Sequence, residues 1–100
     1  MGVVWLPIRY REFYDFPRAF VVQLPGSMYY FDCPFDNQVD EYPDHYRVYR
    51  LAPDVPVPPD GESWEGLEQH GQFVREIPTQ GVRFDGTKRV SVDAKILENL

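Results

Sequence analysis

Apolar and polar residues alternate along much of the chain with the two-residue period of β-strands. The segment from Val3 to Phe13 carries apolar side chains on alternate positions. Residues 15–18 break this pattern, so we expect the first strand to end before them. The runs at 19–24 and 28–32 are rich in strand-forming residues and flank the turn pair Pro25-Gly26, which predicts a hairpin.

The second half of the chain predicts more strands and two short helical segments. The strand-like runs are 45–51, 72–77, 81–84 and 87–92. Asp85-Gly86 separates the last two runs and is a strong signal for a two-residue hairpin turn with a positive φ at Gly86.

Prolines from Pro53 to Pro59 favour an extended connection between the strands at 45–51 and 72–77. After it, Ser63 can cap a short helix from Trp64 to His70. Asp93 can cap a final turn or short helix from Ala94 to Leu100.

These elements predict a mainly β fold in a single domain, residues 1–100. We expect a small antiparallel barrel or sandwich of six to seven short strands, SH3-like or OB-like in architecture, with one short helix after the proline-rich loop. The alternation assigns nine apolar residues to the core: Val4, Leu6, Ile8, Phe20, Val22, Leu24, Val48, Phe84 and Val90.

The net charge of the chain limits the kinds of partner that it attracts. Sixteen acidic residues against ten basic ones give a net charge of −6, which disfavours nonspecific attraction to nucleic acid or anionic lipid and favours a basic partner. A single cysteine provides no disulfide framework, and no apolar run is long enough for a signal-peptide core or a membrane span. We therefore expect a soluble cytoplasmic protein.

The carboxylates are segregated into two connections. Between Arg18 and Arg47 the chain has five acidic residues and no Lys or Arg, and between Arg50 and Arg75 it has five more and again no Lys or Arg. The first connection is expected to be a loop, with at most one helical turn near Val39. If both emerge at one end of the fold, they form an acidic surface edged by aromatic residues, as interfaces require. The candidate partner-binding residues are Asp36, Asp40, Glu41, Tyr42, Asp44, Trp64 and Glu65.

Interpretations of the first acidic connection as a metal site or a catalytic site are weaker. Its carboxylates lack the alternating spacing and the glycine of a calcium loop, and the chain holds only Cys33, His45 and His70 as nitrogen or sulfur ligands. Cys33 with His45 as base would be a nucleophile pair, but Asp32 and Asp36 beside Cys33 should raise the pKa of its thiol. We expect no metal site, no cofactor and no enzyme activity.

The leading hypothesis is therefore a small acidic interaction module, of adaptor, inhibitor or immunity-like type, that binds a basic protein. The alternative is a small barrel that binds nucleic acid or another anionic ligand, because arginines stand beside tyrosines in the strands, as in Arg9-Tyr10-Arg11 and Tyr49-Arg50. A minor alternative makes the segment from Arg50 to Pro56 a ligand for SH3 domains. Self-association stays open.

Overall fold

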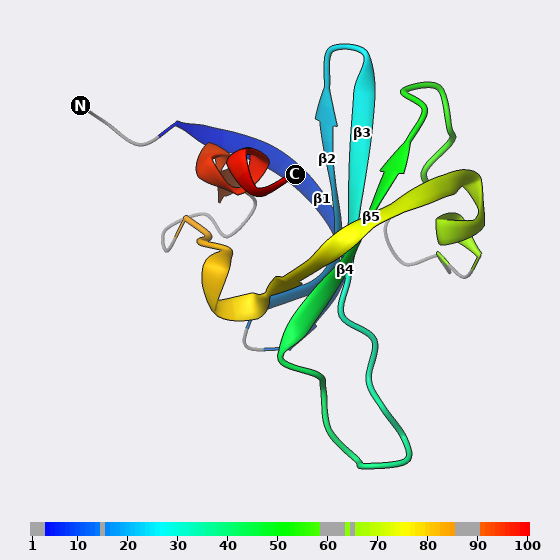
Figure 1. The fold of residues 1–100 in the computed structure, drawn as a ribbon, viewed down its shortest axis with the longest axis vertical. Helices are drawn as coiled ribbons and strands as arrows, with labels where there is room; N and C mark the ends of the chain where they lie inside the picture. The colour runs from blue at the N-terminus through cyan, green and yellow to red at the C-terminus, as the bar shows by residue number, and fades with distance from the viewer. Residues whose placement is uncertain (1–3, 15, 59–63, 65, 86–90) are drawn as a thin grey trace.

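The computed structural model describes residues 4–14, 16–58, 64, 66–85 and 91–100, and its strands form one antiparallel sheet (Figure 1). Six strands lie side by side in the order β5-β4-β3-β2-β1-β6. Their bounds are β1 Trp5–Tyr14, β2 Phe16–Leu24, β3 Ser27–Asp32, β4 His45–Leu51, β5 Gly71–Pro78 and β6 Ser91–Asp93. Three short 3₁₀ segments accompany them: η1 Leu67–His70, η2 Thr79–Gly81 and η3 Ala94–Asn99.

The first five strands form a meander, and β6 returns to the far side of β1. The long strand β1 serves two neighbours, because Trp5 to Pro7 pair with β6 while Ile8 to Tyr14 pair with β2. A register shift between Tyr10 and Glu12 in the pairing with β2 has the form of a β-bulge, which bends a strand. Among the described strands β5 and β6 are the two edges and do not pair, so the sheet is open. The mainly β, antiparallel prediction is confirmed, whereas closure into a barrel is not observed.

One turn and one strand boundary test the sequence analysis, and a second predicted turn does not. The hairpin between β2 and β3 is confirmed, with Gly26 at φ 81°. The expected break at residues 15–18 is wrong for its last three positions, because β2 begins at Phe16 and Pro17 pairs with Phe13. The predicted turn at Asp85-Gly86 cannot be compared, since Gly86 lies outside the described residues.

The helical predictions are met in part. Asp93 caps η3 as expected, and its side chain accepts a hydrogen bond from the Lys95 backbone N–H at 2.9 Å. The helix expected from residue 64 to 70 is only the 3₁₀ turn η1. The strand expected at 81–84 is wrong, because this segment makes only an isolated bridge between Phe84 and Val92.

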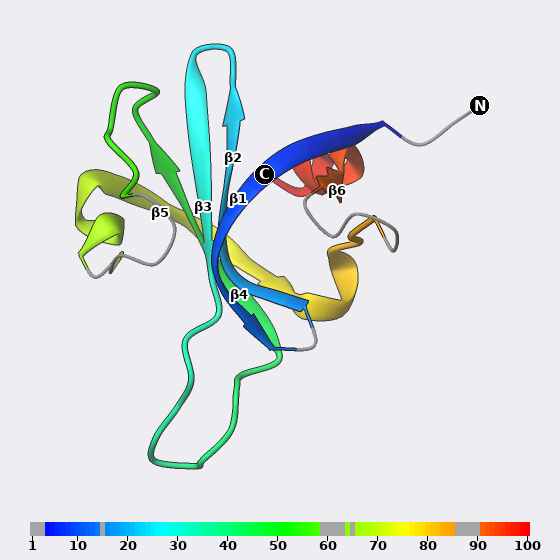
Figure 2. The same ribbon diagram turned by 180° about the vertical axis from the view of Figure 1, so that it is seen from behind.

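Both faces of β2 are buried, which explains the continuous apolar run in this central strand, whereas the edge strand β5 is largely exposed. One face carries a core cluster closed by the C-terminal segment, visible beside β1 in Figure 2. Its buried members are Ile8, Phe20, Val22, Phe31, Cys33, Tyr46, Val48, Ile77, Val82, Val92 and Ile96. The other face carries a second cluster, formed by Ala19, Val21, Met28, Tyr30, Tyr49, Leu51, Trp64 and Leu67.

The nine expected core residues divide unevenly. Ile8, Phe20, Val22 and Val48 are buried as predicted, and Leu6, Leu24 and Phe84 pack against the first cluster while partly buried. Val4 is wrong, because it precedes β1 and is 63% exposed; Val90 lies outside the described residues. The second cluster was missed entirely, because alternation was read as one buried face.

The proline-rich connection provides cover for the second cluster. Val55 and Val57 pack against it. The Arg9 guanidinium donates to the Pro58 carbonyl at 2.8 Å, and the Trp64 indole N–H donates to the same oxygen at 3.1 Å. The segment is not extended throughout, as the sequence analysis expected, because the Val55 backbone N–H donates to the Ala52 carbonyl at 3.1 Å and closes a turn. It lies over the second cluster, and its Val57 and Pro58 carbonyls accept from side chains. No helix in the described ranges is long and apolar enough to cross a membrane.

Gly71 should be sensitive to any side chain, because β4 approaches it closely. A Cβ there would lie 2.3 Å from Leu51 Cδ2 and 2.7 Å from the Arg50 carbonyl oxygen. We expect Gly71→Ala to lower the free energy of unfolding by about 1–3 kcal/mol, as overpacking does, measured by urea denaturation. Gly81→Ala is the matched control, because its Cβ would meet only Ile77 Cγ2 at 3.7 Å. Equal midpoints for the two variants would contradict the β4–β5 register.

Two buried tyrosines should make the fold sensitive to alkali. Burial raises the pKa of Tyr46, whose hydroxyl donates to the Pro17 carbonyl at 2.6 Å, and burial followed by the charges of Asp32 and Glu68 raises the pKa of Tyr30. The unfolded chain releases these protons near pH 10 while the folded chain retains them. Full stability is therefore present below about pH 10 and is lost above it, by about 1.4 kcal/mol per pH unit for each tyrosine.

Urea titrations from pH 8 to 12 measure this slope. Tyr46→Phe removes one of these groups, so it should reduce the loss by about 1.4 kcal/mol per pH unit, although it also costs the bond to Pro17 and lowers stability at pH 8. A wild-type stability that stays constant to pH 12 would rule out the burial of both phenols.

Candidate functional site

The connection from Cys33 to Asp44, here called the acidic arm, projects from one end of the sheet (Figure 1). It is a hairpin extension, since the backbones of Asp36 and Glu41 exchange hydrogen bonds of 2.9 and 3.2 Å. At its tip Gln38 N–H donates to the Asp36 carboxylate at 2.9 Å, and Asp40 adopts a left-handed φ of 56°. The connection is a loop, as expected, and the helical turn that the sequence analysis allowed near Val39 is absent: Asp36 and Asp40 stabilise a hairpin turn there.

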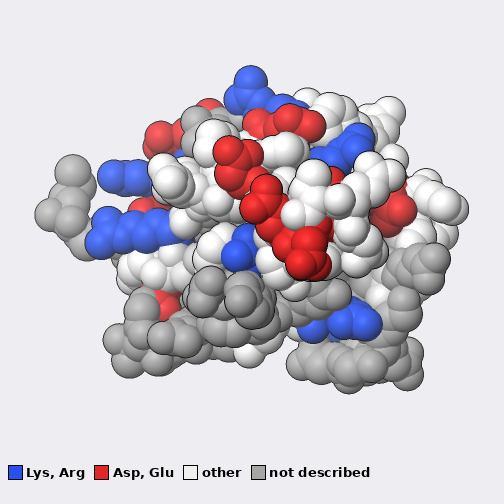
Figure 3. All heavy atoms as spheres, turned by 90° about the horizontal axis from the view of Figure 1, so that it is seen from below, with Lys and Arg blue, Asp and Glu red and all other residues white. Residues whose placement is uncertain are grey.

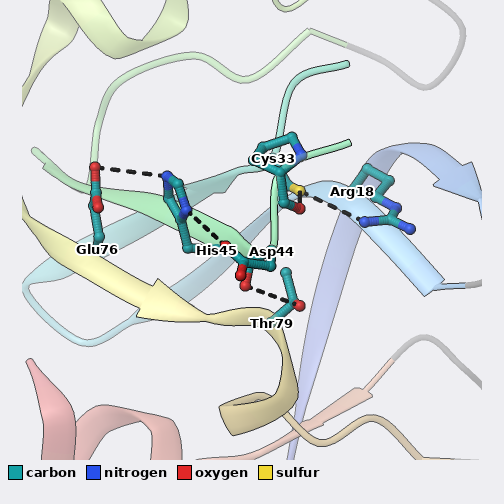
Figure 4. A network of polar contacts seen from close by, with 7 residues as sticks. Arg18, Cys33, Asp44, His45, Glu76 and Thr79 are labelled. Atoms are coloured by element: carbon teal, nitrogen blue, oxygen red, sulfur yellow. Dashed lines mark hydrogen bonds and ion pairs between the residues drawn. The ribbon is translucent and has the colours of Figure 1, made fainter. Parts of the chain in front are cut away.

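The base of the acidic arm is held by Cys33 (Figure 4). Its backbone N–H donates to the Arg18 carbonyl at 2.7 Å, and its thiol, fully buried, donates to the Pro43 carbonyl at 3.3 Å. The Arg18 guanidinium donates to the same sulfur at 3.6 Å. Beyond Pro43, the Asp44 carbonyl accepts from the Thr79 backbone N–H at 2.9 Å. Both ends of the arm are thus tied to the sheet and to η2.

The chemistry of this cysteine opposes a nucleophilic role. Burial raises the pKa of the Cys33 thiol, the hydrogen bond and charge of Arg18 lower it, and Asp32 and Asp44 raise it again, with a net rise. The imidazole of His45 faces carboxylates, with Nδ1 3.3 Å from Asp44 and Nε2 3.6 Å from Glu76 (Figure 4). The two halves of the hypothetical nucleophile pair therefore have other partners.

A buried arginine lies where the acidic arm meets β2. Arg18 is 7% exposed, and its guanidinium carbon lies 3.9 Å from the centroid of the Phe16 ring and 4.3 Å from that of Tyr42. Stacking of this kind suits the weakly hydrated guanidinium group. Arg18 therefore joins the first residues of β2 to the returning strand of the arm.

A hollow of about 570 Å³ opens beside this arginine. Its wall holds three aromatic rings, from Phe16, Phe35 and Tyr42, and the Phe35 and Tyr42 rings form a T-shaped pair with a centroid distance of 5.0 Å. Three carboxylates complete it, from Asp40, Glu41 and Asp44. Counting Arg18, the lining carries a net charge of −3 + 1 = −2. Asp36 does not line it and belongs to a separate hollow on the side of Arg47.

The structure brings together most, though not all, of the expected partner-binding residues. Asp36, Asp40, Glu41 and Asp44 are exposed, Tyr42 is half-buried, and acidic side chains form a band across this end of the molecule (Figure 3). Trp64 is only 4% exposed and packs in the second cluster with its ring 6.1 Å from Tyr30. Glu65 lies outside the described residues.

The two acidic connections leave β4 at opposite ends. Successive connections of an antiparallel meander must alternate between the ends of the sheet, so the one before His45 and the one after Leu51 cannot share an end. The condition set for a shared acidic surface in the sequence analysis, that both connections emerge at one end, is therefore not met; Asp60, Glu62 and Glu65 of the second connection lie outside the described residues. The candidate site is therefore the acidic arm, which includes Phe35, and the adjoining residues Phe16, Arg18 and Thr79. The sequence analysis did not select these four residues.

The arginines of the alternative hypothesis have divided roles. Arg9 is bonded to the Val57 and Pro58 carbonyls, and Arg18 is buried. Arg47, by contrast, is exposed on β4 with its guanidinium 5.2 Å from the Phe73 ring centroid, and Phe73 is 50% exposed on the edge strand β5. Arg47 and Phe73 thus present one cationic and aromatic surface to an anionic ligand on β4 and β5.

Cys33 should react slowly with iodoacetamide at neutral pH. Its thiol is buried and its pKa is raised, so alkylation requires the base of the arm to open. We expect a rate roughly a hundredfold or more below that of the urea-unfolded chain, since such opening costs a few kcal/mol. Mass spectrometry of timed samples measures the rate, with free glutathione as reference. A folded protein that reacts faster than glutathione would indicate an activated thiolate.

Comparisons with family models, curated proteins and solved structures found no match to this chain. The residues and geometry of the chain itself therefore carry the functional argument.

Proposed function

We propose that this chain is a non-enzymatic interaction module that binds a basic protein through its acidic arm. The observation that carries the proposal is the exposure of apolar side chains among carboxylates on an ordered projection. Phe35 is 40% exposed and Val39 is 59% exposed, with Asp36, Asp40 and Glu41 around them. Apolar contact in the middle and charge at the rim is the usual arrangement of a protein interface.

The order of the arm supports this role. Its tip is held by the Asp36–Glu41 pair and its base by Cys33, so binding need not fix a disordered loop. A preorganised loop avoids much of the conformational entropy that association otherwise costs. The arm thus resembles a rigid binding loop in its physical properties.

The charge of the arm supports the choice of partner. Within the described ranges, the carboxylates of Asp40 and Glu41 have no ion-pair partner, so their field extends into solvent. Such a field accelerates encounter with a cationic protein, and salt weakens it over a screening length of about 8 Å at physiological ionic strength. We infer that the partner presents lysines or arginines to this end of the sheet.

A second candidate function rests on a different surface. The stacking of Arg47 on Phe73 would suit a single-stranded nucleic acid or another anionic ligand on β4 and β5. The net charge of −6 opposes it. The same binding assay separates the two functions, because they require ligands of opposite charge.

Neutralising the acidic arm should weaken binding of a basic ligand. The test variant is Asp36→Asn, Asp40→Asn, Glu41→Gln, in which Asn keeps the acceptor for Gln38 at position 36 and tolerates the left-handed φ at position 40. The probe is a fluorescent lysine- and arginine-rich peptide, followed by anisotropy. We expect about tenfold weaker binding, since exposed ion pairs contribute up to about 1 kcal/mol each.

The matched control removes three charges elsewhere: Asp54→Asn, Glu68→Gln, Glu98→Gln. Both variants have the same net charge, so only the location differs, and the control should bind within about twofold of wild type. Equal losses in the two variants would show that binding follows net charge and not the arm. A labelled oligonucleotide run in parallel should not bind; if it binds and Arg47→Gln abolishes that binding, the second function is correct.

A further inference from the structure

The geometry points to the hollow beside Arg18 as a subsite for one arginine side chain of the basic partner, an inference that rests on the proposed function and specifies its ligand. The ligand class is a planar guanidinium group. It would lie on the exposed Phe35 ring, because Arg18 already stacks on Phe16 and Tyr42, and it would meet the three carboxylates at the rim.

The charge of the lining selects a cation. Asp40, Glu41 and Asp44 contribute three negative charges against the one positive charge of Arg18. The Asp44 side chain is fully exposed, so it is available at the mouth although its Oδ1 also lies 3.3 Å from His45. A phosphate or carboxylate group would approach Arg18 only past these carboxylates, which would repel it.

The aromatic residues select a flat cation. Arg18 demonstrates the geometry, because its own guanidinium stacks against Phe16 and Tyr42 at 3.9 and 4.3 Å. Phe35 is 40% exposed and forms a T-shaped pair with Tyr42, and its ring offers a further aromatic surface. A guanidinium can stack flat on such a ring and bond a carboxylate with two nitrogens at once, whereas an ammonium group has a single nitrogen and no flat face.

The hollow also has rigid walls. Phe16 belongs to β2, Tyr42 and Asp44 belong to the tied end of the arm, and Thr79 joins η2 to the Asp44 carbonyl through both its backbone N–H and its hydroxyl. Groups held on strands and at fixed loop ends keep their spacing before a ligand arrives. The side chain of one partner residue can therefore be recognised apart from the rest of its surface.

Nuclear magnetic resonance with ¹⁵N-labelled protein tests the subsite. The probe is acetyl-Gly-Gly-Arg-Gly-Gly-amide, compared with peptides in which citrulline or lysine replaces the arginine. We expect saturable shifts of the Tyr42, Asp44 and Thr79 amides with a Kd near 1 mM. The citrulline peptide, which keeps the shape and loses the charge, should bind at least about fivefold more weakly, and the lysine peptide about two- to threefold more weakly.

Two pairs of variants localise the effect. Glu41→Gln should weaken the arginine peptide several-fold, and Asp36→Asn should not, although both remove one charge from opposite sides of one hairpin pair and only Glu41 lines the hollow. Phe35→Leu should weaken it about threefold by removing an aromatic face, and Val39→Ala at the tip should leave it unchanged.

The outcomes separate this inference from the proposed function. Equal losses in Glu41→Gln and Asp36→Asn, equal binding of the citrulline peptide, or shifts confined to Gln38 and Val39 would overturn the subsite, while the arm would remain a diffuse acidic surface. Inorganic phosphate that shifts the Tyr42 and Thr79 amides when the arginine peptide does not would show an anion site instead. Saturable arginine binding beside a failed basic-peptide assay would keep the subsite and reject the protein partner.

Discussion

Burial of both faces of the central strands is the constraint on which the rest of this structure depends. The described strands form a single sheet, so the connections between them must cover both of its faces. The C-terminal segment and Val82 cover one face, and the proline-rich connection with Trp64 and Leu67 covers the other. Each covering segment is fixed by polar contacts as well as by packing, as Arg9 and Pro58 show. In the described chain, the acidic arm is the long connection whose residues 34–41 are all exposed and cover neither cluster, so it is the one left for another task.

Local patterns predicted the strands, and long-range packing decided their surroundings. The hairpin at Pro25-Gly26 and the cap at Asp93 follow from residues that are neighbours in sequence, so the sequence analysis found them. The second core cluster could have been anticipated from the unbroken apolar run Ala19 to Val22, which is typical of a strand buried on both faces. The start of β2 was missed because prolines are rare inside strands, and Pro17 is tolerated in a pairing close to the β1–β2 turn.

The candidate site shows the same division between local and distant information. The carboxylates of the acidic arm are adjacent in sequence, and their exposure was predictable from composition alone. The exclusion of Trp64 from the candidate site was not predictable in this way, because its distance from the arm depends on strand order and its burial depends on packing against Tyr30. Had the sheet been recognised as a meander, the alternation of connections between its two ends would have separated the acidic segments at once. The hollow could not be predicted from the sequence, because its lining combines Phe16 of β2, Phe35 of the arm and Thr79 of η2, which are far apart along the chain.

Arg18 connects the stability of the fold to the geometry of the site. Burial of a guanidinium group is costly unless aromatic stacking and hydrogen bonds replace its water, and here Phe16, Tyr42 and the Cys33 sulfur supply such contacts. Two of these three partners, Tyr42 and Cys33, belong to the acidic arm. Any displacement of the arm would therefore remove a stacking partner and a hydrogen-bond acceptor from the buried guanidinium group. The orientation of the arm is therefore coupled to the first residues of β2, and its rigidity is a property of the whole sheet rather than of its own hairpin. An arm that must stay aligned with β2 to satisfy a buried charge also keeps its outward face, with Phe35 and the carboxylates, in one arrangement relative to any ligand.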